Sequence, residues 1–110
     1  WIADYPNPEN FLWLLYGKNV PASFKLPSYP NTPRYVNARY DQLYEKGLSE
    51  TNIAKGYDYF LKAEQIMIED APILVLWFDE IYILKQAHVK NYFSNPIEYY
   101  DLSAVYLQLE

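Results

Sequence analysis

The chain has 110 residues, and 51% of them are hydrophobic, which is enough for one core. Its net charge is −5 with no cluster of Lys or Arg, which argues against nucleic acid as a partner. The lack of Cys excludes disulfides and a thiol nucleophile, and a single His leaves only carboxylates for a transition metal. We therefore predict neither metal nor cofactor. Because the sequence shows no leader and no apolar run near the ~18 residues of a membrane span, we expect no signal or anchor within it.

The first residues, Trp1-Ile2-Ala3-Asp4-Tyr5-Pro6-Asn7-Pro8, are predicted to form a corner stiffened by two prolines. Pro6 and Pro8 fix their own φ angles and push the residues before them into extended conformations. Asn7 can then cap a helix whose first residue is Pro8. Asp4 therefore lies just before a strand-to-helix corner, where α/β proteins commonly place a ligand-facing group.

Three helices are predicted next. Residues 8–16 form an apolar helix that Gly17 ends in the left-handed conformation, and the four prolines of residues 18–36 indicate a loop. Asn37 caps a second helix to about residue 48, which buries Tyr40, Leu43, Tyr44 and Leu48. Asn52 caps a third helix to about residue 69. Its polar stripe is Lys55, Asp58, Lys62, Gln65 and Glu69, and its predicted buried face is Ile53, Tyr57, Phe60, Leu61 and Ile68.

Strands are predicted after Pro72, which stops the third helix. Residues 73–78 are an unbroken apolar run, typical of a strand buried on both faces, and residues 81–84 resume after a turn at Asp79 and Glu80. The pattern of apolar side chains in residues 103–109 alternates well enough to predict a last strand. The predicted fold class is mixed α/β without regular βα alternation, which suits one lobe of a larger protein.

Asp4 is the strongest candidate for a binding residue. Beside Trp1 and Tyr5 it is expected to be partly desolvated, and such a carboxylate needs a cation or several hydrogen-bond donors. A ligand ammonium group would serve, and so would N–H groups of its own proline turn. Trp1 and Tyr5 either line a side-chain pocket or pack under the first helix.

Asp79 and Glu80 are an alternative site, an acid/base pair for hydrolysis. Successive residues point to opposite sides of a strand, and acidic pairs more often lie in hairpin turns. His88 has no Ser, Cys or Asp at a motif spacing, so a nucleophile relay has no support.

The opening motif, Trp1-x-x-Asp4-Tyr5-Pro6-x-Pro8 before an apolar helix, resembles the signature late in the solute-binding proteins of bacterial peptide ABC transporters (oligopeptide, dipeptide and nickel). Residues 37–43, residues 62–72 and the apolar strands ending near residue 90 follow in that family's order. The sequence departs from the family pattern in having Asn7 for Asp, Ala38 for Pro and Asn91 for Gly.

The resemblance implies that residues 1–110 are a single-domain fragment from the C-terminal lobe of a two-lobed, periplasmic-binding-protein-like fold. The whole protein would be a non-enzymatic, periplasmic or extracellular component, membrane-anchored, that binds peptides between its lobes for a membrane permease. Asp4 would pair with the peptide's free α-amino group, Trp1 would also touch the ligand, and the N-terminal lobe would complete the site. Within the family, an oligosaccharide or a nickel complex is an alternative ligand. From another class, the alternative is an aromatic-rich module that docks a protein.

Overall fold

The computed structural model describes residues 1–95 and 98–108, which fall into two compact units. The first unit contains Trp1 and residues 3–75, and the second contains Ile2 and the described residues from Leu76 onward. Helices dominate the first unit, and a short two-stranded sheet lies in the second. The chain therefore combines helices with little sheet.

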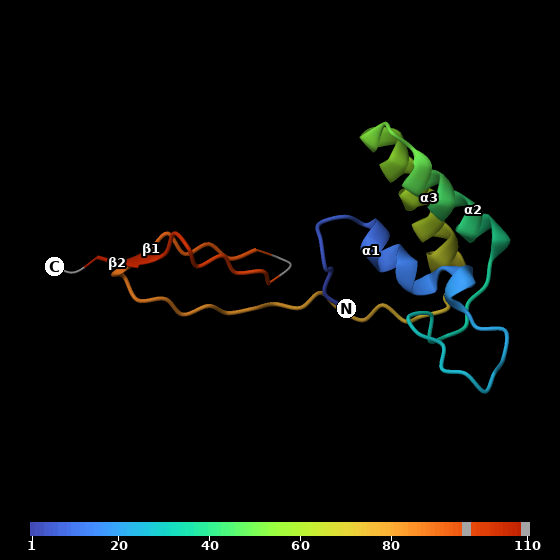
Figure 1. Cartoon of the computed structure of the whole chain (residues 1–110), viewed down its shortest axis with the longest axis horizontal. Coiled ribbons are helices and arrows are strands. Elements are labelled where there is room, and N and C mark those ends of the chain that lie inside the picture. The colour runs from blue at the N-terminus through green and yellow to red at the C-terminus, as the bar shows by residue number, and fades with distance from the viewer. Residues whose placement is uncertain (96–97, 109–110) are drawn as a thin grey trace. The chain divides into compact units, whose positions relative to one another are not determined.

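The first unit is built on a helical hairpin of α2 (Ala38–Ser49) and α3 (Ile53–Asp70), which lie side by side in Figure 1. Both N-caps predicted for the hairpin are confirmed. The side chain of Asn37 accepts from the backbone N–H groups of Arg39 and Tyr40, and that of Asn52 accepts from Lys55 N–H. Helix α3 ends one residue later than predicted, where Ala71 adopts a left-handed conformation with φ 46°.

The first predicted helix is shorter and tighter than expected. It consists of α1 (Glu9–Leu12) followed directly by a 3-10 turn, η1 (Trp13–Leu15). The prediction of a left-handed Gly17 is wrong, because Gly17 has a negative φ and begins a second 3-10 turn, η2 (Gly17–Asn19). Its N–H donates to Asp41 Oδ1 at 2.8 Å, and a Cβ atom there would lie 2.4 Å from Asp41 Oδ2. Gly17 is therefore explained by the close approach of Asp41.

The core of this unit joins α1 and η1 to the hairpin. Its buried side chains are Leu12, Leu15, Tyr40, Tyr44, Phe60, Ala63 and Ile66. The hydroxyl of Tyr40, which has no exposed surface, donates to the Leu12 carbonyl at 2.6 Å. Burial of Tyr40 and Tyr44 confirms the prediction for α2, and Leu43 is half-buried, but Leu48 is exposed, contrary to prediction.

The predicted buried face of α3 is wrong for four of its five residues. Only Phe60 is buried; the exposed residues are Ile53, Tyr57, Leu61 and Ile68. The buried residues of α3 are Gly56, Phe60, Ala63 and Ile66, and the small ones among them let the backbones of α2 and α3 approach closely. Gly56 lies against the backbone of Gly47, and Gly47 in turn makes room for the ring of Phe60. An apolar surface on α3 is thus left uncovered within the described chain.

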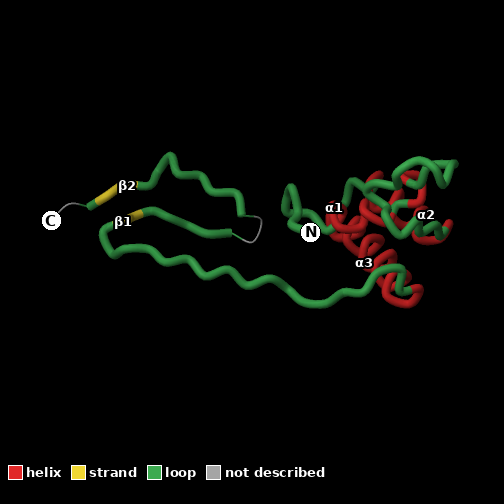
Figure 2. The backbone as a smooth tube through the Cα atoms, turned by 90° about the horizontal axis from the view of Figure 1, so that it is seen from below, coloured by secondary structure: helices red, strands yellow, loops and turns green. Residues whose placement is uncertain are grey.

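The second unit holds less regular structure than the sequence predicts. Residues 73–78 and 81–84 form no strand and are exposed, which corrects the prediction of buried strands (Figure 2). The physical reason is that a strand needs a hydrogen-bonded neighbour, and these segments pair with no described residue. The strands present are β1 (Val89–Lys90) and β2 (Tyr106–Leu107), antiparallel with Val89 opposite Leu107. The predicted last strand shrinks to β2; Leu109 lies outside the described residues.

Candidate functional site

The predicted site residues lie at the corner that precedes α1. Both Trp1 and Asp4 contact the side chain of Asn10, which is buried in α1 with 4% of its surface exposed. Asn10 Oδ1 accepts from Trp1 Nε1 and from the Asp4 backbone N–H, both at 3.0 Å. Its Nδ2 donates to Asp4 Oδ2 at 3.4 Å. The structure thus brings Trp1 and Asp4 together through a residue that sequence reasoning did not single out.

Tyr5 is held by a different residue of α1. Its hydroxyl donates to one carboxylate oxygen of Glu9, and the buried Tyr44 of α2 donates to the other. Asn7 accepts from Glu9 N–H at 2.9 Å, but the N-cap of α1 is Pro8 and the helix begins at Glu9, so the prediction of Asn7 as the cap and Pro8 as the first helical residue is wrong by one position. The corner is therefore fastened to the hairpin by side chains, in addition to the stiffness of its prolines.

The expectation that Asp4 is partly desolvated is wrong in this chain, because its side chain is exposed. Trp1 and Tyr5 are also exposed, by 55% and 44%, so they leave Asp4 open to solvent. Within residues 1–95 and 98–108, no Lys, Arg or His forms an ion pair with Asp4. The corner is thus an exposed carboxylate flanked by two aromatic rings.

The link from Glu9 to Tyr44 predicts a stability change at alkaline pH. Burial and then the hydrogen bond to Glu9 raise the pKa of Tyr44 well above its usual 10.0. A raised pKa in the folded state gives stability that is complete below pH 10 and is lost as pH rises towards the folded pKa. We expect the unfolding free energy of Tyr44→Phe to fall less steeply above pH 10 than that of the wild type, measured by urea titration. Parallel curves for both proteins would contradict this.

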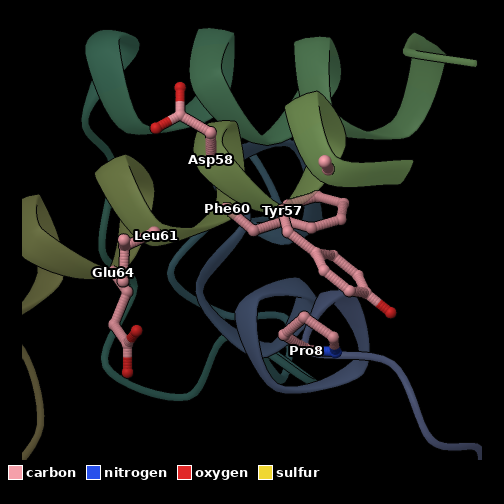
Figure 3. A pocket seen from close by; sticks show the side chains of 7 residues that line it. Pro8, Tyr57, Asp58, Phe60, Leu61 and Glu64 are labelled. Carbon is pink, nitrogen blue, oxygen red and sulfur yellow. The ribbon is translucent and has the colours of Figure 1, made fainter. Parts of the chain in front are cut away.

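A separate groove of about 470 Å³ lies between the start of α1 and the exposed side of α3. It is lined by Pro8, Ala54, Tyr57, Asp58, Phe60, Leu61 and Glu64. Figure 3 shows Pro8 at the start of α1 and the side chains of Tyr57, Leu61 and Glu64, which come from α3. None of the predicted ligand-binding residues lines this groove, which is part of the uncovered apolar surface of α3.

The chain is similar to a peptide-binding protein. It is 26% identical over 102 residues to the dipeptide-binding protein DppE of Bacillus subtilis (strain 168). The match covers 93% of this chain and 17% of that protein, so the chain spans about a sixth of the length of its relative. No family model matches the sequence.

The alternative site at Asp79 and Glu80 lies in the second unit. Asp79 accepts from Trp77 Nε1 at 2.8 Å, and Glu80 accepts from the hydroxyl of Tyr82 at 3.1 Å. Asp79 lines a hollow of about 240 Å³, and Glu80 is not among the residues that line it. An acid/base pair needs both groups at one bond, and this arrangement gives no support for hydrolysis.

Among residues 1–95 and 98–108, no group of three or more His, Asp or Glu side chains lies close enough together to hold a metal ion. Among the helices that can be described, none is both long and apolar enough to cross a membrane.

Two residues that build the corner, Asn10 and Glu9, were missed by sequence reasoning. No sequence signal indicated that Glu9 would accept from Tyr5, because Tyr5 lies outside the helix and the four-residue spacing of a helical turn does not apply to the pair. Asn10 follows Asp4 by six residues across two prolines, a spacing that no regular element would bring into contact. Only the folded corner brings Asn10 to Asp4.

Proposed function

We propose that this chain is the C-terminal part of a solute-binding protein that captures peptides outside the cytoplasm and delivers them to an ABC permease. Asp4 would bind the free α-amino group of the peptide, with Trp1 and Tyr5 beside it. The chain would form one wall of the site as a single-domain segment of a C-terminal lobe, and the N-terminal lobe of the same protein would form the other.

The observation that carries this proposal is the open carboxylate of Asp4 on an anchored corner. Its backbone is held by Asn10, and no described cation neutralises it. A carboxylate that is held in place but has no ion-pair partner suits an ammonium group, which can donate three hydrogen bonds. The likeness to a dipeptide-binding protein supports the same class of ligand.

Calorimetry on the full-length protein tests the proposal. The probes are dialanine and trialanine, each with a free amine and with an N-acetyl group. We expect binding of the free peptides to be at least tenfold tighter, because acetylation removes the positive charge that Asp4 would pair with. Equal affinity for free and acetylated peptides would overturn the proposal. Binding of an oligosaccharide or of a nickel complex would favour that compound as the ligand.

A second candidate is an interaction module, favoured by the apolar surface of α3. Four large apolar side chains of this helix, Ile53, Tyr57, Leu61 and Ile68, are exposed in the chain. An exposed apolar patch of this kind usually contacts another protein surface. In the first proposal the rest of the longer polypeptide covers this surface, whereas in the second a separate protein binds it.

The substitution Leu61→Lys separates the two candidates. Leu61 is 64% exposed in this chain, so a change that acts only within the described contacts should alter stability by less than about 0.5 kcal/mol. If the rest of the full-length protein covers α3, the buried lysine should destabilise that protein by about 2 kcal/mol or more, measured by urea denaturation. Gln65→Lys, on the polar stripe of the same helix, is the matched control. An unchanged full-length protein would favour the interaction module.

A further inference from the structure

Asn10 is a buried polar side chain with three hydrogen-bonding contacts at the corner. Its oxygen accepts from Trp1 Nε1 and Asp4 N–H at 3.0 Å, and its nitrogen donates to Asp4 Oδ2 at 3.4 Å. We infer that Asn10 is a positioning residue for peptide capture, which holds the backbone and carboxylate of Asp4 and the ring of Trp1 in place for the ligand. This inference rests on the proposed function.

The orientation of the Asn10 carboxamide follows from its neighbours. The indole Nε1–H and the backbone N–H are donors only, so the atom facing both must be the carboxamide oxygen. The NH₂ group must then face the carboxylate of Asp4. Because a reversed amide would put donors against two donors, the orientation is fixed by chemistry.

Asn10 also links the exposed corner to the interior. It lies in α1, whose Leu12 belongs to the core and whose Glu9 accepts from the buried Tyr44. Asp4 and Trp1 themselves are exposed and precede the helix by several residues. Groups that bind a ligand bind it more tightly when they are held in place beforehand, because less conformational entropy is lost on binding.

The test uses the full-length protein and the ratio of affinities for free and N-acetylated dialanine and trialanine. Asn10→Ala should reduce this preference for the free amine roughly tenfold, because the hydrogen bonds that fix Asp4 are lost. Asn10→Leu fills nearly the same volume without those bonds and should behave alike, which separates hydrogen bonding from a cavity effect. Asn10→Asp keeps an acceptor oxygen for both N–H groups but turns a second carboxylate oxygen towards Asp4 Oδ2, so it should lose the preference as well, which tests the donor side of the contact.

Asn31 provides a matched control. It is also a fully buried asparagine of the first unit, and its side chain bonds the backbones of Tyr16 and Tyr35, away from the corner. Asn31→Ala should lower stability but leave the preference for the free amine unchanged. An equal loss of preference in Asn31→Ala would overturn the inference, because it would mark a general effect of lost packing.

The outcomes separate this inference from the function on which it rests. If the wild type shows no preference for a free amine, the proposed function and the inference both fall. If the wild type shows the preference, Asp4→Asn loses it, and Asn10→Ala or Asn10→Leu keeps it, then the role of Asn10 alone is overturned.

Discussion

Replacing Asp4 with asparagine in the full-length protein should weaken the binding of a free-amine peptide by about 2 to 5 kcal/mol. Asparagine keeps the size of the side chain and the backbone N–H that Asn10 holds, so the change removes the negative charge and one acceptor oxygen. The affinity for the N-acetylated peptide should change little. Calorimetry with free and acetylated trialanine measures both effects.

The size of the loss reports how the complete site surrounds Asp4. An ion pair that stays exposed to water contributes only about 0.2 to 1 kcal/mol, since solvent screens it. In this chain Asp4 is exposed, so a loss of several kcal/mol requires another part of the protein to exclude water from the pair. A loss below about 1 kcal/mol would mean that the pair with Asp4 stays exposed to water. It would contradict a closed peptide-binding site at this residue.

Glu69→Gln is the control for the change in net charge. Glu69 is an exposed carboxylate of α3 that accepts from Gln65, and its replacement removes one negative charge as Asp4→Asn does. We expect it to leave the preference for the free amine unchanged. If both variants weaken binding equally, long-range attraction by net charge explains the effect, and direct pairing with Asp4 does not.

Replacing Phe60 with alanine should lower the unfolding free energy by about 3 to 5 kcal/mol. Phe60 is 5% exposed, and its ring lies 6.3 Å from that of Tyr44. The substitution removes apolar contacts and leaves a cavity where Gly47 allows the two helices to meet. Urea denaturation followed by far-ultraviolet circular dichroism measures the change.

Leu48→Ala is the comparison for this loss. Leu48 is a large apolar residue of α2 with 53% of its surface exposed, so its truncation should cost less than about 1 kcal/mol. A loss for Phe60→Ala no greater than that for Leu48→Ala would contradict the packing of Phe60 against Gly47 and Tyr44.

Sequence reasoning found the corner but not what holds it. It indicated Asp4, Trp1 and Tyr5 from residue types and proline stiffness. In the structure, Trp1 and Asp4 both donate hydrogen bonds to the side chain of Asn10. It expected Asp4 to be shielded because aromatic residues precede and follow it. Neighbours in sequence shield a carboxylate only if their rings fold over it, and here both rings are exposed.

The sequence by itself determined the local features of this protein. The caps Asn37 and Asn52, the end of α3 before Pro72 and the irregular proline-rich loop depend on backbone conformation within a few residues, so residue type is enough to predict them. Only the tertiary structure decided which face of α3 is buried, because that face is chosen by the fit of Gly47 to Phe60 on another helix. It also decided that the apolar segments 73–78 and 81–84 form no sheet, since a strand requires a partner that local sequence does not supply.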